Sequence, residues 1–211
     1  MEIKSEKSVY FGMALLLMIM ITGISSADPV NVELVSHFSG TYSDVAVNGN
    51  YMYLLQDQDL VVVDIEDPSD PVEVGRISTP STAYDIAVTG NYAYVAEGES
   101  GLMIIDIGNP AAPAIKGSYA ASEQARYVYV SGKYAYVADD GLVVLDVSDP
   151  AAPALACRYE IQGDINDVTV SGKYAYLLIL DYTDRSQDAL IDLVVLDVSD
   201  PAAIKYMGDH G

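Results

Sequence analysis

The sequence predicts an all-β fold, a β-propeller built from four-stranded blades, on three observations. One block recurs four times, and its glycine falls at Gly49, Gly90, Gly132 and Gly172, which are 41, 42 and 40 residues apart. Each block places Gly-Asn or Gly-Lys between two runs of β-forming residues, and an apolar run that ends in aspartate follows. A fixed period of this size is typical of solenoids, propellers and arrays.

Each repeat is expected to hold four strands. Glycine followed by asparagine or lysine is the chemistry of a two-residue type II′ hairpin turn, so residues 85–89 and 92–96 should pair antiparallel. The next run, 102–106, is apolar at consecutive positions and is expected to be covered on both faces. A proline-containing turn ends it, and residues 114–119 are expected to close the unit. Four short antiparallel strands make one propeller blade.

Two other architectures fit the sequence less well than the propeller. A parallel β-solenoid does not need a tight antiparallel hairpin and usually has shorter repeats, and a single sandwich gives no reason for a regular period. The ends of the array stay open to two interpretations. Residues 28–39 match the segment that follows each Asp-Pro, and residues 201–211 stop inside another copy of it. Either four blades close a ring, which makes one of these segments redundant, or the array is incomplete.

The apolar run reads LVVVD, LMIID, LVVLD and LVVLD in the four repeats and ends at Asp64, Asp106, Asp146 and Asp197. This motif resembles the LVIVD-repeat family, over nearly all of residues 28–211. The resemblance implies a β-propeller in a secreted or cell-surface protein. The family has no single known reaction, so it implies no catalytic residues. From the residues themselves, these four aspartates are expected to accept hydrogen bonds from the turn amides that follow, each worth ~1 kcal/mol.

Residues 1–27 are predicted to be a secretory signal peptide. Residues 9–24 carry no charge, and small residues at 25–27 suit cleavage after Ala27. The uncharged run is shorter than the ~20 residues that a spanning helix needs, although two glutamates near the start keep an uncleaved anchor as the alternative. The remaining chain is expected to hold a terminal strand at 28–43 and repeats at approximately 44–84, 85–126, 127–166 and 167–211.

Composition excludes several classes of function. The net charge of −21 disfavours nucleic acid and anionic lipid as partners; it suits cations or basic partners, and its simplest role is solubility. Cys157 is the single cysteine, so no intramolecular disulfide is possible, and its apolar surroundings predict burial. With only His37 and His210, there is little material for a histidine-rich zinc site or a histidine-based triad. Pairs of acidic residues are so common in this sequence that they are not informative, and a catalytic carboxylate pair of the glycosidase type is not excluded.

Paired tyrosines recur in every repeat, two residues apart, so each pair faces one side of its strand. We expect them to form the packing layer between neighbouring blades, with a sugar-stacking platform as the alternative reading. The pairs are Tyr51 and Tyr53, Tyr92 and Tyr94, Tyr134 and Tyr136, and Tyr174 and Tyr176.

Antiparallel order predicts two unlike faces. The hairpin turns and Asp/Asn-Pro turns share one face, and the irregular loops share the other, which we call the variable face. Recognition usually lies on such loops. Asp44, Asp85, Tyr127 and Asp167 hold one repeat position at the start of the innermost strand and should converge near the axis. The hypothesis is that Asp44, Asp85 and Asp167 bind Ca²⁺ or another hard cation; the alternative is that each caps its own loop through backbone N–H groups.

The fourth repeat carries an insertion on the variable face, residues 181–192. It is interpreted as a lid or partner-binding finger, with a solvated extended hairpin as the alternative. Its candidate binding residues are Asp181, Tyr182, Asp184 and Arg185.

These features predict an exported, acidic binding or adhesion module at the cell surface, with a protein or glycan partner. An enzyme that uses carboxylates of the variable face on a polysaccharide is the first alternative, and a structural envelope component is the second.

Overall fold

The computed structural model describes residues 35–121, 123–181 and 190–210. The predicted signal peptide lies outside the described residues. Among the described residues, no helix is long and apolar enough to cross a membrane. Sixteen β-strands account for the regular structure there, in four sheets of four strands each.

Each sheet is one antiparallel blade, and its strands follow one another in sequence order. Blade 1 contains β1 (Asp44–Asn48), β2 (Tyr51–Gln56), β3 (Asp59–Asp64) and β4 (Val72–Ser78). Blade 2 contains β5 (Asp85–Thr89), β6 (Tyr92–Ala96), β7 (Leu102–Asp106) and β8 (Ala114–Tyr119). Blade 3 contains β9 (Tyr127–Ser131), β10 (Tyr134–Ala138), β11 (Leu142–Asp146) and β12 (Ala154–Tyr159). Blade 4 contains β13 (Asp164–Ser171), β14 (Tyr174–Asp181), β15 (Leu190–Asp197) and β16 (Lys205–His210).

The hairpin turns have the predicted chemistry. Gly49 has φ +61° and the three matching glycines have φ between +57° and +60°, whereas the residue that follows each glycine is not among the residues with positive φ. This is the pattern of a type II′ turn. The register confirms it, since Asn48 pairs with Tyr51 across the two turn residues.

The turn that ends each third strand is closed by its aspartate, as predicted. The N–H of Glu66 donates to Asp64 Oδ1 over 2.8 Å. The other three aspartates accept in the same way over 3.0 Å each, from Gly108, Ser148 and Ser199. The face opposite the variable face therefore repeats the same aspartate-capped turn in all four blades.

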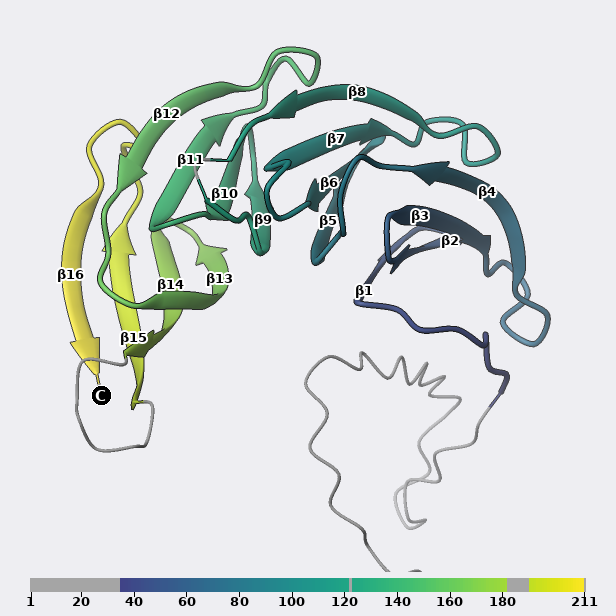
Figure 1. The fold of residues 1–211 in the computed structure, drawn as a ribbon, viewed down its shortest axis with the longest axis horizontal. Helices are drawn as coiled ribbons and strands as arrows, with labels where there is room; N and C mark the ends of the chain where they lie inside the picture. Colours follow the sequence, from purple (N-terminus) through teal and green to yellow (C-terminus); the bar gives the residue numbers. More distant parts are fainter. Residues whose placement is uncertain (1–34, 122, 182–189, 211) are drawn as a thin grey trace, which may run out of the picture.

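The four blades fan out along an open arc (Figure 1). The innermost strands β1, β5, β9 and β13 lie side by side in that order, and the blades radiate from them. Blades 1 and 4 stand at the two ends of the arc, with a gap between them. Of the two interpretations that the sequence left open, a closed four-blade ring is therefore wrong for this arrangement, and the blades form an open array.

The core consists of the junctions between neighbouring blades. We call the side chains that meet the next blade the leading face, and those that meet the preceding blade the trailing face. In blade 1 the leading face is Tyr53, Leu55, Leu60 and Val62, and it packs against the trailing face of blade 2. That trailing face is Ala93, Val95, Met103 and Ile105. Blades 2 and 3 and blades 3 and 4 meet through the matching positions.

Tyrosines of the pairs in blades 1 to 3 take part in these junctions, as the sequence predicts. Tyr53, Tyr94 and Tyr136 are only 2%, 4% and 3% exposed. Their partners Tyr51, Tyr92 and Tyr134 are half-buried and pack against the same clusters. The prediction for Cys157 is less accurate, because its thiol is half-buried. It lies in β12, the outermost strand of blade 3, where one side of the sheet approaches solvent.

Candidate functional site

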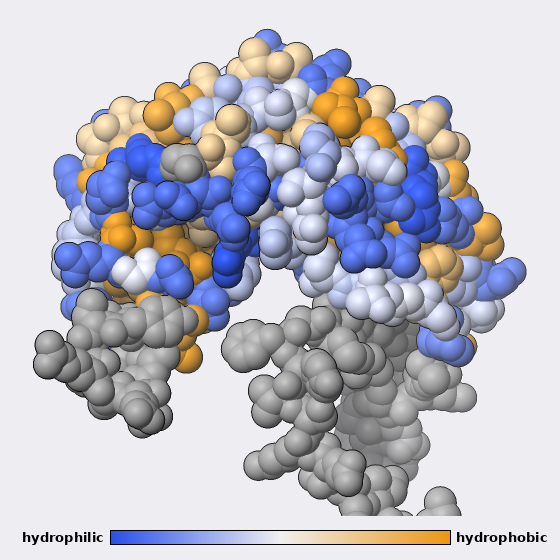
Figure 2. Space-filling model, viewed as in Figure 1, coloured by the Kyte–Doolittle hydropathy of each residue, from blue (hydrophilic) through white to orange (hydrophobic). Residues whose placement is uncertain are grey.

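The variable face gathers the candidate residues at the inner edge of the arc. Asp44, Asp85 and Tyr127 begin the innermost strands β1, β5 and β9, and Asp167 lies within β13. Because these strands are neighbours, the four side chains follow one another along the inner edge. Figure 2 shows hydrophilic side chains along this edge.

Two of these aspartates link one blade to the next through the backbone. The N–H of Ile86 in blade 2 donates to Asp44 Oδ2 over 2.9 Å. The N–H of Val128 in blade 3 donates to Asp85 Oδ2 over 2.7 Å. In each case the donor is the residue directly after the matching position in the following blade. We call this contact the blade latch. The alternative to metal binding placed each aspartate as a cap of its own loop, whereas these two N–H groups belong to the following blade. Asp85 also accepts, over 3.0 Å, from the N–H of Ile86 in its own strand.

The latch brings two carboxyl groups close together. Burial is the main cause that raises the pKa of Asp85 to about 8, and the neighbouring Asp44 side chain is the second. The backbone N–H groups of Val128 and Ile86 act in the opposite direction, but they do not outweigh burial. Burial and the Asp44 side chain both favour a proton on this pair of carboxyl groups, and a shared proton relieves the repulsion between them.

Tyr127 replaces aspartate at the latch position of blade 3. Its hydroxyl donates to Asn166 Oδ1 over 3.3 Å, so the link to blade 4 runs between side chains. Burial raises the pKa of Tyr127, and the charges of Asp85 and Asp167 on either side raise it further. Asp167 itself is exposed.

No group of three or more histidine, cysteine, aspartate or glutamate side chains is arranged to hold a metal ion in the part of the chain that the structure describes. Asp44 and Asp85 contact backbone N–H groups and each other's carboxyl group. Calcium binding by Asp44, Asp85 and Asp167 remains a prediction that these contacts do not support.

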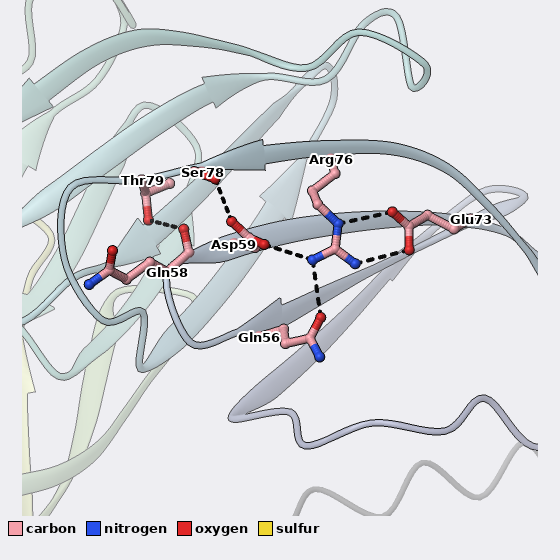
Figure 3. Close-up of polar contacts among 7 residues, drawn as sticks. All are labelled: Gln56, Gln58, Asp59, Glu73, Arg76, Ser78 and Thr79. Carbon is pink, nitrogen blue, oxygen red and sulfur yellow. Dashed lines mark hydrogen bonds and ion pairs between the residues drawn. The ribbon is translucent and has the colours of Figure 1, made fainter.

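An arginine network joins β4 of blade 1 to the ends of β2 and β3 on the variable face (Figure 3). Arg76 in β4 donates to both carboxylate oxygens of Glu73, over 2.9 and 3.0 Å, and to Asp59 Oδ2 over 2.7 Å. It also donates to Gln56 Oε1 over 3.1 Å. The Ser78 hydroxyl and Arg76 together lower the pKa of Asp59. All of these groups are partly exposed, so the network orders the surface more than it stabilises the fold.

Blade 3 uses an arginine at the same repeat position. Arg158 in β12 donates to Asp139 Oδ2 over 3.0 Å and to the Asp139 carbonyl over 2.7 Å. Asp139 is 3% exposed, and it also accepts from the N–H of Glu123 over 2.9 Å. This buried carboxylate therefore has a cation and a backbone donor.

Blade 2 has the buried acid but lacks the arginine. Glu97 follows β6 at the position of Asp139 and is fully buried, and neither of its carboxylate oxygens has a hydrogen-bond partner among the residues that the structure describes. Burial raises the pKa of Glu97 to about 7. The nearby Thr79 hydroxyl lowers that pKa slightly, although it donates to the carbonyls of Gln58 and Ser81. Residue 118, which matches Arg76 and Arg158, is serine.

The sequence analysis missed Glu97, yet the repeats held the signal. Each of these outer-strand residues pairs with the second residue of the apolar run: Arg76 with Val61, Arg158 with Val143, and Ser118 with Met103. A repeat that has an acid at the position of Asp139, but no arginine at the position of Arg158, is expected to hold a carboxyl group without a counter-ion.

Replacing Ser118 by arginine should give Glu97 the counter-ion that Asp139 has. We expect the pKa of Glu97 to fall from about 7 toward its ordinary range, because a cation beside a buried carboxylate favours the charged form. Carboxyl-carbon NMR titration would measure the shift. Ser118→Gln, which adds length without charge, is the control and should leave the titration nearly unchanged. An unaltered Glu97 titration in Ser118→Arg would contradict the assignment.

The insertion of the fourth repeat lengthens a hairpin where the structure describes it. β14 and β15 continue their ladder through Leu178 with Leu193, Ile179 with Asp192, Leu180 with Ile191, and Asp181 with Leu190. This is the extended hairpin of the alternative reading. Tyr182, Asp184 and Arg185 lie outside the described residues, so the lid or finger interpretation remains a prediction.

Radial four-stranded antiparallel sheets whose innermost strands lie side by side define the β-propeller class. A model of the LVIVD repeat matches residues 39–79, 80–121, 123–161, 162–182 and 188–210. These matches cover well over half of the sequence, so the chain belongs to the LVIVD-repeat family. No curated protein matches it.

Solved structures show the same fold at low sequence identity. The periplasmic gluconolactonase PpgL of Pseudomonas aeruginosa superposes with a TM-score of 0.63 at 16% identity, over 81% of this chain and 54% of that one. The computationally designed protein Ika8 gives 0.63 at 11%, over 81% and 49%. The designed protein Ika4 gives 0.58 at 12%, over 83% and 96%. The chain thus spans about half the length of PpgL and Ika8.

Proposed function

We propose that the chain is an exported binding module, and that the loops of its variable face contact a protein or glycan at the cell surface. The contrast between the two faces carries this proposal. One face repeats the same aspartate-capped turn in every blade. The other differs in each blade: an arginine network in blade 1, an uncompensated acid in blade 2, an arginine-acid pair in blade 3 and an extended hairpin in blade 4.

Variation on a constant scaffold is the usual arrangement of a recognition surface. The net charge of −21 favours a partner with basic groups at the contact. The predicted signal peptide supports export, and mass spectrometry of the secreted protein should find Asp28 as the first residue.

Binding to purified surface proteins and surface polysaccharides would test the proposal. Glu123, Arg126 and Asp140 are exposed on the variable face, and their alanine variants should weaken binding about tenfold or more. Lys133→Ala and Asp149→Ala on the opposite face are the matched controls and should bind as the unaltered chain does. Equal effects from both faces, or no binding to either class of partner, would refute the proposal.

The adjacent carboxyl groups of Asp44 and Asp85 favour a second function, a carboxylate-dependent enzyme acting on a polysaccharide. Two neighbouring carboxyl groups, one of which has a raised pKa, are the residue types that general acid and base catalysis needs. Hydrolysis of the same polysaccharides would test it. Turnover that Asp85→Asn abolishes would support the enzyme; turnover that survives this change would exclude the pair.

A further inference from the structure

The leading face of blade 4 is partly open, whereas the matching faces of the other blades are buried. The second tyrosine of the pair is 2% to 4% exposed in blades 1 to 3, but Tyr176 is only half-buried. Two residues further, Leu55, Ala96 and Ala138 are at most 4% exposed, whereas Leu178 is 40% exposed. The repeat therefore places apolar side chains in blade 4 for a contact that residues 35–121, 123–181 and 190–210 of its own chain do not complete.

The third strand shows the same contrast. Leu60, Leu102 and Leu142 are completely buried, as are the residues two positions further in each strand. Leu193 and Val195 hold these positions in β15 and are half-buried. The neighbouring Ile191 is 61% exposed. Figure 2 shows hydrophobic residues at the surface of this end of the arc. Exposed apolar area of this kind marks an interaction surface.

The blade latch supplies a second, independent observation. Asp44 and Asp85 each accept the N–H of the residue after the latch position in the next blade. Asp167 holds the latch position of blade 4 and is exposed. By the same rule, the Asp167 carboxylate would accept a hydrogen bond from the next blade. The donor would be the N–H of the residue directly after the latch position, and in blade 1 that residue is Val45.

The trailing face of blade 1 carries the residues that would pack against such a leading face. Its residues Met52, Leu54, Val61 and Val63 hold the positions that pack on a leading face at all three internal junctions. Phe38 and Tyr42 of the same chain pack against these four residues, which are all at most 4% exposed. A second copy must therefore take the place of part of this cover.

Residues 36–38 stand where the outermost strand of a preceding blade would lie. The Ser36 hydroxyl donates to the Pro68 carbonyl over 2.6 Å. Gly75 of β4 and Gly117 of β8 approach the carbonyls of Pro110 and Pro150 of the following blades in the same way. The segment forms no strand ladder, however, whereas β16 pairs along β15 from Lys205 to His210. A complete blade that arrived here would therefore displace residues 36–38.

We propose that two copies of this chain close one ring, with the leading face of blade 4 of each copy seated on the trailing face of blade 1 of the other. Each contact joins unlike surfaces, and two such contacts close the assembly. Every new junction repeats the packing of the three internal ones and adds the latch from Asp167 to Val45. The lengths of two solved structures agree with this, because the chain spans 49% of Ika8 and 54% of PpgL, whereas it spans 96% of Ika4.

Light scattering coupled to size exclusion would test the proposal over a range of concentrations. The unaltered chain should have the mass of a dimer. Leu178→Asp should weaken association by ~100-fold, because it puts a charge into an apolar junction. It should leave the monomer folded, since Leu178 is already exposed, and circular dichroism would verify this. Ile115→Asp and Leu155→Asp, at exposed sites on the outermost strands β8 and β12, are matched controls and should remain dimeric.

Two further variants separate the parts of the junction. Asp167→Ala should weaken the dimer about tenfold, and removal of residues up to 38 should strengthen it. A monomer at all concentrations would overturn the proposal, as expected if further blades of a longer chain covered this face. An open-ended series of masses, or a dimer that Leu178→Asp does not weaken, would overturn it as well.

Discussion

Leu142→Ala should lower the free energy of unfolding by ~2–5 kcal/mol, whereas Leu193→Ala should cost only ~1 kcal/mol. The two leucines begin the apolar run of blades 3 and 4 and differ mainly in their surroundings. Leu142 is completely buried in the junction between these blades, and Leu193 is half-buried on the open leading face. Replacing leucine by alanine leaves a cavity only where the neighbouring blade covers the side chain. Urea unfolding in dilute solution, where copies do not associate, would measure both losses.

Leu102→Ala, in the junction between blades 2 and 3, is the control and should behave like Leu142→Ala, since it is equally buried. Equal losses at Leu142 and Leu193 would mean that the leading face of blade 4 is covered within a single chain, which the open arc does not allow.

The free energy of unfolding should fall as the pH rises from about 4 to about 8, by on the order of 3 kcal/mol from Asp85. The pKa of Asp85 is raised from 3.8 to about 8 in the folded chain, so this group keeps its proton over a range in which the unfolded chain has lost it. A raised pKa contributes stability below the unfolded value, and that stability is lost as the pH passes the folded value. Glu97, with a pKa raised to about 7, acts in the same direction.

Asp85→Asn should remove most of this dependence. The amide oxygen still accepts from Val128, and the amide N–H₂ donates as the protonated carboxyl does, but the group no longer titrates. Urea unfolding at about pH 5 and about pH 9 would compare the variants. Glu97→Gln should remove a smaller part, and Asp140→Asn, at an exposed site, should leave the difference unchanged. If the Asp85→Asn chain kept the full difference, the carboxyl pair would not be its source.

Local signals predicted the blades well. The expected strands at 85–89, 92–96 and 114–119 coincide with β5, β6 and β8. Glycine at the turn and proline after the third strand act within a few residues, so no tertiary information is needed. The caps at Asp64 and its three counterparts were predictable for the same reason.

The closure of the ring was not predictable, because the curvature of the arc depends on how side chains of different blades fit at each junction. The repeat positions also predicted that Asp44 and Asp85 lie at the inner edge, but they could not identify the N–H groups that donate hydrogen bonds to them. Those donors, Ile86 and Val128, belong to the next blade, and the stagger between blades decides which N–H comes within reach.

The arrangement of the blades is tested most directly by small-angle X-ray scattering of the Leu178→Asp chain in dilute solution. The account predicts a profile that fits four blades along an open arc, with blades 1 and 4 apart. A profile that fits a closed four-blade ring, or a straight stack of sheets, would contradict it.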